Sequence, residues 1–281
     1  MYSLRGGTNC QLRIMKLISK GIIFWTILTS LFISCFPSEQ KTLSALDSHN
    51  HEHWSYEGET SPEHWAEIEK NSSCDSKYQS PINIIDIDAS ADETGWMELN
   101  IAYSPLTLIH DVLNNGHTIQ FDFELGDSIY FHEKNYSLRQ IHFHEPAEHT
   151  INGVRYPIEI HLVHLSSDND FTVLGILGEE GETSQPFDFL ESFLPVQEGE
   201  TKIIDKSFNL NDLLPVNDRS FYHYHGSLTT PPCSEDVNWI LFKKPVILSV
   251  DQVKLLKELM PLNNYRNEQP LNDRVVWKNF Q

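Results

Sequence analysis

The segment Gln140–Glu145 carries two histidines separated by one residue. In a β-strand, successive side chains point to opposite faces, so His142 and His144 would share one face with Gln140. Their imidazoles would then lie about 6 to 7 Å apart along the strand, which is close enough to bind one metal ion.

A third histidine lies in the segment Ile158–Leu165. The same alternation places Glu159, His161 and Val163 on one face of that strand and His164 on the other. The face that carries a histidine therefore also carries a carboxylate. We predict that the two strands pair as antiparallel neighbours through the turn Asn152-Gly153, which would bring the histidines of both together.

Three histidines and one open coordination position form the ligand set of a catalytic zinc, whereas structural zinc sites are closed by four protein ligands. Gln140 and Glu159 each precede a histidine by two residues on the same face, so they are placed to accept the second ring N–H of His142 and His161. The other interpretation is that histidines are merely tolerated on half-buried strands. The same-face acceptors favour the metal site.

The elements that would position these residues are mostly strands. Short alternating or β-branched runs fill the chain between Gln79 and Leu248, including Thr118–Glu124, Phe171–Leu177 and Val237–Phe242. The first of these follows the turn signal Asn114-Asn115-Gly116. Val250–Met260 is the best helical candidate, with Ser249 as its N-cap. We predict a mainly β single domain with a few short helices.

Composition excludes several classes of protein. The chain has 281 residues, 40% of them hydrophobic, which is enough for one large core. Its 20 basic and 40 acidic residues give a formal charge of −20, which argues against a nucleic-acid-binding surface and against adsorption to anionic lipid. The count of 14 histidines is high and fits a metal-binding protein.

Residues 1–34 have the composition of a secretory leader. They contain Arg5, Arg13, Lys16 and Lys20 but no acid, and an uncharged apolar run begins at Gly21. This run is shorter than the roughly 20 residues that span a bilayer. Met15 precedes two of the lysines and is a candidate for the true start of the protein.

Leu31-Phe-Ile-Ser34 before Cys35 resembles the lipoprotein box of exported bacterial proteins, in which the cysteine becomes the lipidated first residue. We expect lipidation at Cys35, with simple cleavage or an uncleaved anchor as alternatives. Residues 35–50 then form a polar tether, and residues 51–281 form the domain. This organisation predicts export to the periplasm or cell envelope, with membrane attachment only through the lipid.

Cys74 and Cys233 are the two cysteines in the presumed domain, residues 51–281. Disulfides persist in oxidising compartments, so an even pair in an exported domain suggests a bridge. Two unpaired buried thiols are the alternative.

Beyond the histidines, a series of motifs along the domain resembles the α-class carbonic anhydrases. The motifs run in family order over the whole presumed mature domain: Trp54-Ser-Tyr56, Gln79-Ser-Pro-Ile-Asn83, Asn115-Gly-His117, His142-Phe-His144, Glu148-His-Thr150, Glu159-Ile-His-Leu-Val163, Gly226-Ser-Leu-Thr-Thr-Pro-Pro232 and Gln269-Pro-Leu-Asn272. The resemblance implies a large twisted, mostly antiparallel central sheet. It also implies reversible hydration of carbon dioxide to bicarbonate and a proton, inhibited by sulfonamides and anions.

In the family pattern, His142, His144 and His161 bind one zinc ion per chain, and a water or hydroxide fills the fourth position and attacks the substrate. The backbone carbonyl at Asn264 orients His144. Cys74 and Cys233 match the cysteines that form a disulfide in secreted members.

The pattern also implies the remaining roles at the centre. The hydroxyl of Thr229 donates to a buried carboxylate, Glu148, which aims an oxygen lone pair at the substrate. Thr230 lines the bicarbonate site. The apolar carbon dioxide pocket is formed by four matching side chains: Val163, Val173, Leu228 and Trp239.

His117 matches the family's proton shuttle, a role that suits a histidine of ordinary pKa at the mouth of a cleft. Tyr56, Asn115 and Gln120 match the positions that order the intervening waters, although Gln120 replaces a common Asn. His51 and His53 fit a second relay or a mobile tail. His223 and His225 have no assigned role, and His225 stands where the family commonly has Pro.

Two other functions compete with the enzyme. A non-catalytic member would use the same fold to bind a partner, but such proteins typically lose a zinc histidine. A zinc-buffering exported protein would account for the many histidines and acids but not for the pair Thr229 and Glu148. The sequence leaves the oligomeric state open, a homodimer included.

Overall fold

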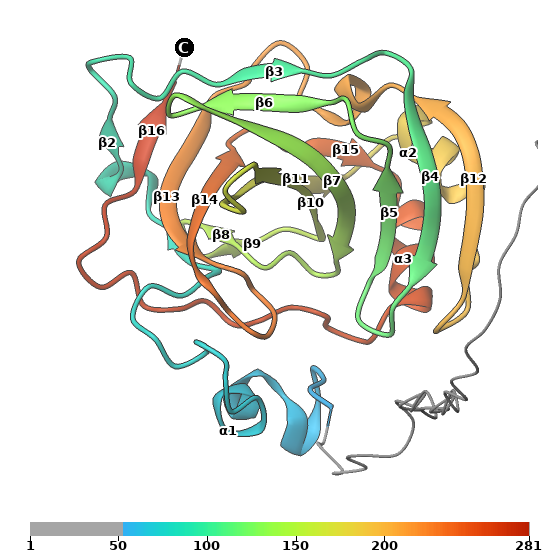
Figure 1. Ribbon diagram of the computed structural model, residues 1–281, viewed down its shortest axis with the longest axis horizontal. Helices are drawn as coiled ribbons and strands as arrows, with labels where there is room; N and C mark the ends of the chain where they lie inside the picture. Colours follow the sequence, from blue (N-terminus) through green and yellow to red (C-terminus); the bar gives the residue numbers. More distant parts are fainter. Residues whose placement is uncertain (1–52, 281) are drawn as a thin grey trace, which may run out of the picture. The chain divides into compact units, whose positions relative to one another are not determined.

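Strands form most of the computed structural model, which describes residues 53–280, and within them one large twisted sheet runs through the molecule (Figure 1). Its neighbours follow the order β12-β4-β5-β7-β10-β11-β14-β13-β16-β2, with β3, β6 and β15 attached beside this path. Most pairings are antiparallel, but β11 pairs with β14 and β15, and β16 with β2, in parallel. The prediction of a mainly β domain with a mostly antiparallel sheet is confirmed.

The strands in chain order are β1 (Asn83–Ile84), β2 (Ser90–Ala91), β3 (Asn100–Ala102), β4 (Thr107–Asn114), β5 (Ile119–Phe123), β6 (Ser128–Phe131), β7 (Lys134–His144), β8 (Thr150–Ile151), β9 (Val154–Arg155), β10 (Ile158–Ser166), β11 (Phe171–Glu180), β12 (Thr201–Phe208), β13 (Phe221–Ser227), β14 (Glu235–Phe242), β15 (Val246–Leu248) and β16 (Trp277–Asn279). The α-helices are α1 (Trp65–Ile68), α2 (Gln185–Glu191) and α3 (Val250–Leu259). Four short 3-10 helices accompany them in residues 53–280: Gly58–Thr60, Pro62–His64, Asp86–Asp88 and Leu210–Leu213.

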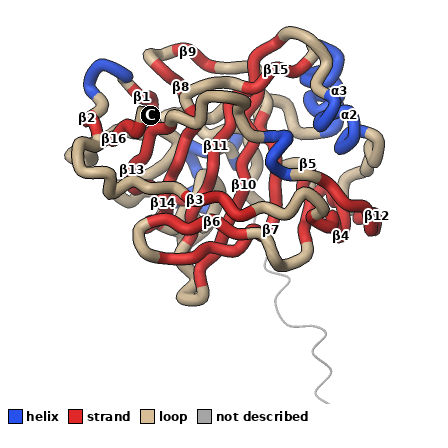
Figure 2. Tube along the Cα trace, turned by 90° about the horizontal axis from the view of Figure 1, so that it is seen from above, coloured by secondary structure: helices blue, strands red, loops and turns tan. Residues whose placement is uncertain are grey.

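Local sequence signals place these elements well. The turn after Asn114 joins β4 to β5 as an antiparallel pair. The Ser249 side chain accepts the backbone N–H of Gln252, and the Gln252 side chain accepts the N–H of Ser249, so α3 begins with a complete capping box. Helices α2 and α3 lie together beside the end of the sheet formed by β4, β5 and β12 (Figures 1 and 2).

Strands β7 and β10 pair antiparallel as predicted, but the turn Asn152-Gly153 does not join them directly. It joins β8 to β9, a small hairpin inserted between the two longer strands, and β8 also pairs with β1. Both turn residues have positive φ, at 52° and 76°, which is the backbone of a tight hairpin turn. The turn prediction was right, whereas the connection assigned to it was wrong.

The sheet separates two apolar clusters because alternate residues of one strand point to opposite faces. On β10, Ile158, Ile160 and Leu162 belong to the larger core, which extends to α2 and α3. Val163 belongs to the smaller cluster on the other face, together with Val173 and Trp239. Glu159 and His161 alternate along β10 with the residues of the larger core. The polar groups of the site therefore face the smaller cluster.

None of the helices in the described residues is both long enough and apolar enough to cross a membrane. Residues 1–52, which include the predicted leader and Cys35, lie outside the described part of the chain.

Candidate metal centre and its surroundings

Three histidines from two neighbouring strands converge at the centre of the sheet. His161 of β10 is the direct cross-strand partner of His142 on β7, and His144 follows two residues later on the same face. The three ring centroids lie 4.7 to 5.0 Å apart. Their nitrogens form one of the groups in the described chain that are close enough to bind one ion. The sequence prediction that these histidines meet is confirmed.

Each ring uses one nitrogen to donate a hydrogen bond. Nδ1 of His142 donates to Oε1 of Gln140 over 2.9 Å, and Nε2 of His161 donates to Oε1 of Glu159 over 2.8 Å. Nδ1 of His144 donates to the backbone carbonyl of Asn264 over 2.6 Å. These are the partners expected for Gln140, Glu159 and Asn264.

The other nitrogen of each ring therefore carries a lone pair and faces the other two rings. Nε2 of His142 and Nδ1 of His161 lie only 3.2 Å apart, although neither carries a proton to donate. Nε2 of His144 is buried and has no hydrogen-bond partner. Two ligands at about 2.0 to 2.1 Å from a tetrahedral ion are separated by roughly this distance, so the cluster fits a zinc ion.

Burial keeps these histidines neutral, which is the form that binds a metal. It lowers the pKa of His144 to about 4 and holds the pKa of His142 well below its usual range, and mutual repulsion among the rings contributes. The pKa of His161 is also lowered by burial, although Glu159 opposes the shift. At neutral pH the cluster therefore presents lone pairs and no positive charge.

Glu148 lies fully buried beside the cluster. One of its oxygens is 3.5 Å from Nε2 of His144, and the other accepts the backbone N–H of Arg266 over 3.0 Å. Burial raises the pKa of Glu148 to about 7, while His161 and the nearby Thr229 side chain oppose the shift. The Oε2 atom of Glu148 is buried and has no hydrogen-bond partner. A cation held by the histidines would favour the charged carboxylate.

The apolar side chains expected around a substrate pocket meet on this face. Val163 pairs across strands with Val173, and Val173 pairs with Trp239, so three adjacent strands supply one continuous wall. The ring of Trp239 lies 4.9 Å from that of His161. Leu228 packs against the same cluster, and Thr229 is buried while Thr230 is half-exposed.

A buried hydrogen-bond chain behind the metal ligands extends beyond the predicted set. His149 donates from Nδ1 to Glu159 and accepts at Nε2 from the Tyr224 hydroxyl, which in turn contacts the Ser80 hydroxyl over 2.8 Å. Glu159 also accepts the backbone N–H groups of Glu148 and His149. This carboxylate orients His161 and also fixes the backbone at Glu148. Ser80 and His149 lie within quoted motifs, whereas Tyr224 does not, and no spacing rule connects the three residues.

Arg266 was also missed by the sequence analysis. Its guanidinium is buried and donates to Gln79 and Ser80 through Nη1 and to the Cys74 carbonyl through Nη2. Because its backbone N–H binds Glu148, Arg266 connects the disulfide region to the site.

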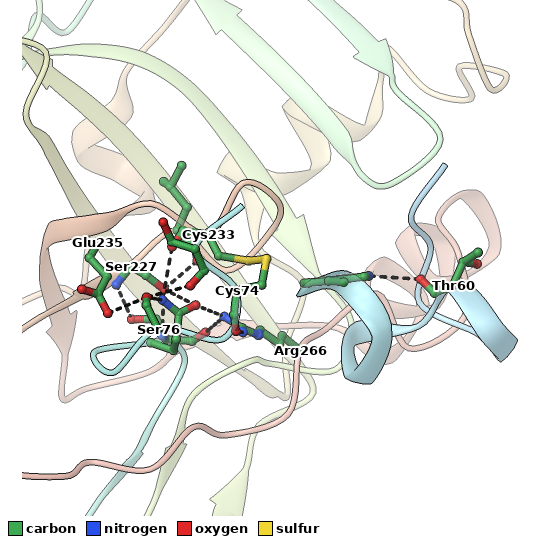
Figure 3. Close-up of a disulfide and its surroundings, with 12 residues drawn as sticks. Thr60, Cys74, Ser76, Ser227, Cys233, Glu235 and Arg266 are labelled. Atoms are coloured by element: carbon green, nitrogen blue, oxygen red, sulfur yellow. Dashed lines mark hydrogen bonds between the residues drawn. A yellow bond between two sulfur atoms is a disulfide. The ribbon is translucent and has the colours of Figure 1, made fainter. Parts of the chain in front are cut away.

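The predicted disulfide between Cys74 and Cys233 is present (Figure 3). Cys233 donates its backbone N–H to Thr230, and Ser73 donates to Pro232, so the bridge fixes the turn that carries Thr229 and Thr230. A disulfide indicates an oxidising compartment, in agreement with export.

Reduction of the bridge is expected to lower the melting temperature and the activity together. The bridge spans 159 residues, for which loss of loop-closure entropy predicts about 4 to 5 kcal/mol of stabilisation. Thermal unfolding and activity should be measured with and without reductant, with C74S/C233S as the permanently open variant. An unchanged melting temperature in that variant would contradict a stabilising bridge.

His117 lies in the turn between β4 and β5, stacked on Trp54 with ring centroids 3.6 Å apart. Its Nε2 shares a hydrogen bond of 2.8 Å with Nε2 of His53. Burial, and repulsion by His53, lower the pKa of His117 to about 4. The sequence analysis expected an ordinary histidine pKa here, and the stacked position differs from that expectation because Trp54 and His53 displace water from the ring.

The three residues expected to order water have different surroundings. Tyr56 is buried, and its ring lies 6.3 Å from that of His117. The Asn115 side-chain oxygen accepts the backbone N–H groups of His117 and Thr118, so it stabilises the turn. Gln120 pairs across strands with His142 and donates its side-chain amide to Asp122.

Comparison with known proteins gives a consistent result. The family model for eukaryotic-type carbonic anhydrases matches residues 60–280. A carbonic anhydrase of Klebsiella pneumoniae is 41% identical over 230 residues, covering 80% of this chain and 90% of that protein. The structure of α-carbonic anhydrase from Thermovibrio ammonificans in complex with sulfanilamide is similar, with a TM-score of 0.76 and 38% identity over 80% of this chain and 98% of that one. The structure of dioscorin complexed with ascorbate is also similar, with a TM-score of 0.73 and 31% identity over 82% of this chain and 98% of that one.

Proposed function

Because this chain belongs to the α-class carbonic anhydrase family and has its carbon dioxide hydration activity, we propose that the reaction takes place at one zinc ion held by His142, His144 and His161. The observation that carries the proposal is the pair of lone-pair nitrogens of His142 and His161, 3.2 Å apart in a buried site. Without a cation this arrangement is repulsive. When bound, zinc supplies Lewis acidity that makes water ionise near neutral pH.

The residues around the ion position the reactants. An ionised Glu148 only accepts hydrogen bonds, so it would fix the Thr229 hydroxyl as its donor and leave the Thr229 oxygen to accept a hydrogen bond from the reacting water. Thr230 borders the same space and is suited to bind bicarbonate. The wall of Val163, Val173, Leu228 and Trp239 excludes water from the side where apolar carbon dioxide would bind.

The test measures zinc content, carbon dioxide hydration by stopped flow and inhibition by an aromatic sulfonamide on one sample. The sulfanilamide complex of the Thermovibrio ammonificans protein supports this choice of inhibitor. One zinc per chain with hydration blocked by the sulfonamide is expected. One zinc without hydration above the buffer blank would favour a binding protein on this fold.

We assign proton transfer to buffer to His117. Its backbone carbonyl accepts the side-chain amide of Asn264, the residue whose own carbonyl binds His144, and this connection to the site supports the role. The stacked ring with a pKa of about 4 is, however, a weak base at neutral pH. Efficient transfer therefore requires the ring to leave Trp54 and His53 and regain a more ordinary pKa.

His117→Ala is expected to slow turnover in dilute buffer by about 10-fold or more, because a positioned proton-transfer group contributes typically 10²–10⁴-fold. Added imidazole should restore the rate. His64→Ala, which changes a partly exposed histidine outside the site, is the control. An unchanged rate in dilute buffer would assign the transfer to another group.

We also propose that the protein is held at the cell envelope through a lipid on Cys35. The support is the leader composition of residues 1–34 and the sequence Leu31-Phe-Ile-Ser34 before this cysteine. Mass spectrometry of the mature N-terminus tests it, since an unmodified Cys35 would contradict the proposal.

A further inference from the structure

Three more histidines gather away from the centre described above. His223 and His225 lie two residues apart on β13, and His132 lies in the turn between β6 and β7. The ring centroid of His223 lies 5.0 Å from that of His132 and 5.1 Å from that of His225. We call these three residues the outer histidine cluster.

The distances from the His223 ring to each of the other two rings are close to those between the rings of the central site. In the central site, the corresponding centroids are 4.7 to 5.0 Å apart. The pair His132 and His225 is wider, at 6.4 Å, and the nitrogens of the three rings do not converge in this structure. Binding of one ion by all three therefore requires the exposed His225 ring to turn toward the others.

Two of the rings carry buried nitrogens without a partner. Nδ1 of His223 donates to the backbone carbonyl of Trp239 over 3.0 Å, which leaves a lone pair on Nε2. That Nε2 is buried and makes no hydrogen bond, and His223 has no exposed surface. Nε2 of His132 is likewise buried and unpartnered. Buried polar atoms of this kind require a ligand or cost free energy.

The backbone at His132 adopts an energetically disfavoured conformation. His132 and Glu133 have φ of 48° and 61°, so both central residues of the β6–β7 hairpin turn adopt the left-handed conformation. Asn and Gly are the residues preferred there. The turn places the His132 ring between Phe131 and Trp96, with centroid distances of 3.9 and 4.7 Å, and next to His223 of β13. The β6–β7 hairpin lies beside the end of β13 (Figure 1). A disfavoured conformation that delivers a metal-binding side chain to two others suggests a function.

We propose that the outer histidine cluster is a second metal site, which binds a divalent transition ion of the kind that prefers imidazole, namely Cu²⁺, Ni²⁺ or Zn²⁺. His223 supplies the buried ligand, His132 the second and His225 the third after turning inward. The remaining positions of the ion are open to water.

The electrostatics agree with this geometry. Burial and repulsion between the rings lower the pKa of His132 and His223, and burial lowers that of His225. The rings are therefore neutral and competent as ligands at neutral pH. The charge of Asp236 acts on His225 and would favour a cation there.

The experiment titrates the zinc-loaded protein with Cu²⁺ and counts the bound ions per chain, with retention of the catalytic zinc measured on the same sample. His132→Asn removes the ligand but keeps a residue suited to left-handed backbone. His225→Ala removes an exposed ligand. Each variant is expected to weaken one Cu²⁺ site by about tenfold or more, because even residues that only support a ligand contribute 10–100-fold. The copper EPR signal of that site should lose nitrogen coupling.

His110→Ala is the matched control, since His110 is an exposed histidine on β4. It should leave Cu²⁺ binding at the outer histidine cluster unchanged. His144→Ala changes the central site and should also leave it unchanged, so failure of the central zinc assignment and failure of this proposal are distinguishable. Binding curves of His132→Asn and His225→Ala that coincide with that of the unmodified protein would overturn the proposal.

Discussion

Replacement of His144 by alanine is expected to remove bound zinc and to reduce carbon dioxide hydration by more than about 100-fold. The ring is buried, its Nδ1 is held by the Asn264 carbonyl, and its Nε2 has no protein partner. The variant therefore loses one of the three proposed ligands. Removal of a supporting residue alone typically costs 10–100-fold in affinity, and a direct ligand costs more.

The measurement is zinc content by elemental analysis beside the stopped-flow rate, with circular dichroism to verify folding. His110→Ala is the control because its side chain is exposed and distant in sequence from all three ligands. A folded His144→Ala protein with one zinc per chain and full activity would contradict the ligand assignment. If the variant keeps its zinc but loses its activity, His144 does not bind the ion and instead positions the groups around it.

Thr229→Val is expected to lower kcat/KM by about 100-fold while zinc content stays unchanged. Valine keeps the shape of the side chain but removes the hydroxyl that we propose as the donor to Glu148. Without this hydroxyl, the group that accepts a hydrogen bond from the reacting water is lost, and misplacement of a reacting group costs about 10²-fold.

Thr229→Ser retains the hydroxyl and should stay within a few-fold of the unmodified protein, which makes it the matched control. Glu148→Gln should lower kcat/KM similarly, and the double variant Thr229→Val/Glu148→Gln should be little worse than either single change. Additive losses would show that the two residues act independently. Equal activity of the valine and serine variants would remove the hydroxyl from the mechanism.

The outcome of these experiments also separates the enzyme from a binding protein. The similarity to dioscorin, solved in complex with ascorbate, illustrates that related chains occur with a different small molecule. In this chain, all three histidines, their acceptors and the pair of Thr229 and Glu148 are together. That combination is explained by catalysis and not by binding alone.

The sequence by itself determined the local parts of the site. The alternation of β-strands put His142 and His144 on one face with Gln140, and Glu159 on one face with His161, because side-chain direction within a strand depends only on the residue count. For the same reason, the strand runs and the Ser249 cap of α3 were predictable from neighbours in the chain. The family motifs then suggested the roles of distant residues such as Asn264.

Only the tertiary structure decided how these parts meet. The register that places His161 opposite His142 depends on the β8–β9 hairpin between the strands, which the spacing did not reveal. The contacts of Arg266 with Gln79 and Cys74 join residues far apart in the chain, and the stacking of His117 on Trp54 changes a pKa that its local sequence leaves ordinary. Burial and long-range hydrogen bonds have no periodicity in the chain, because they depend on which surfaces fold against each other.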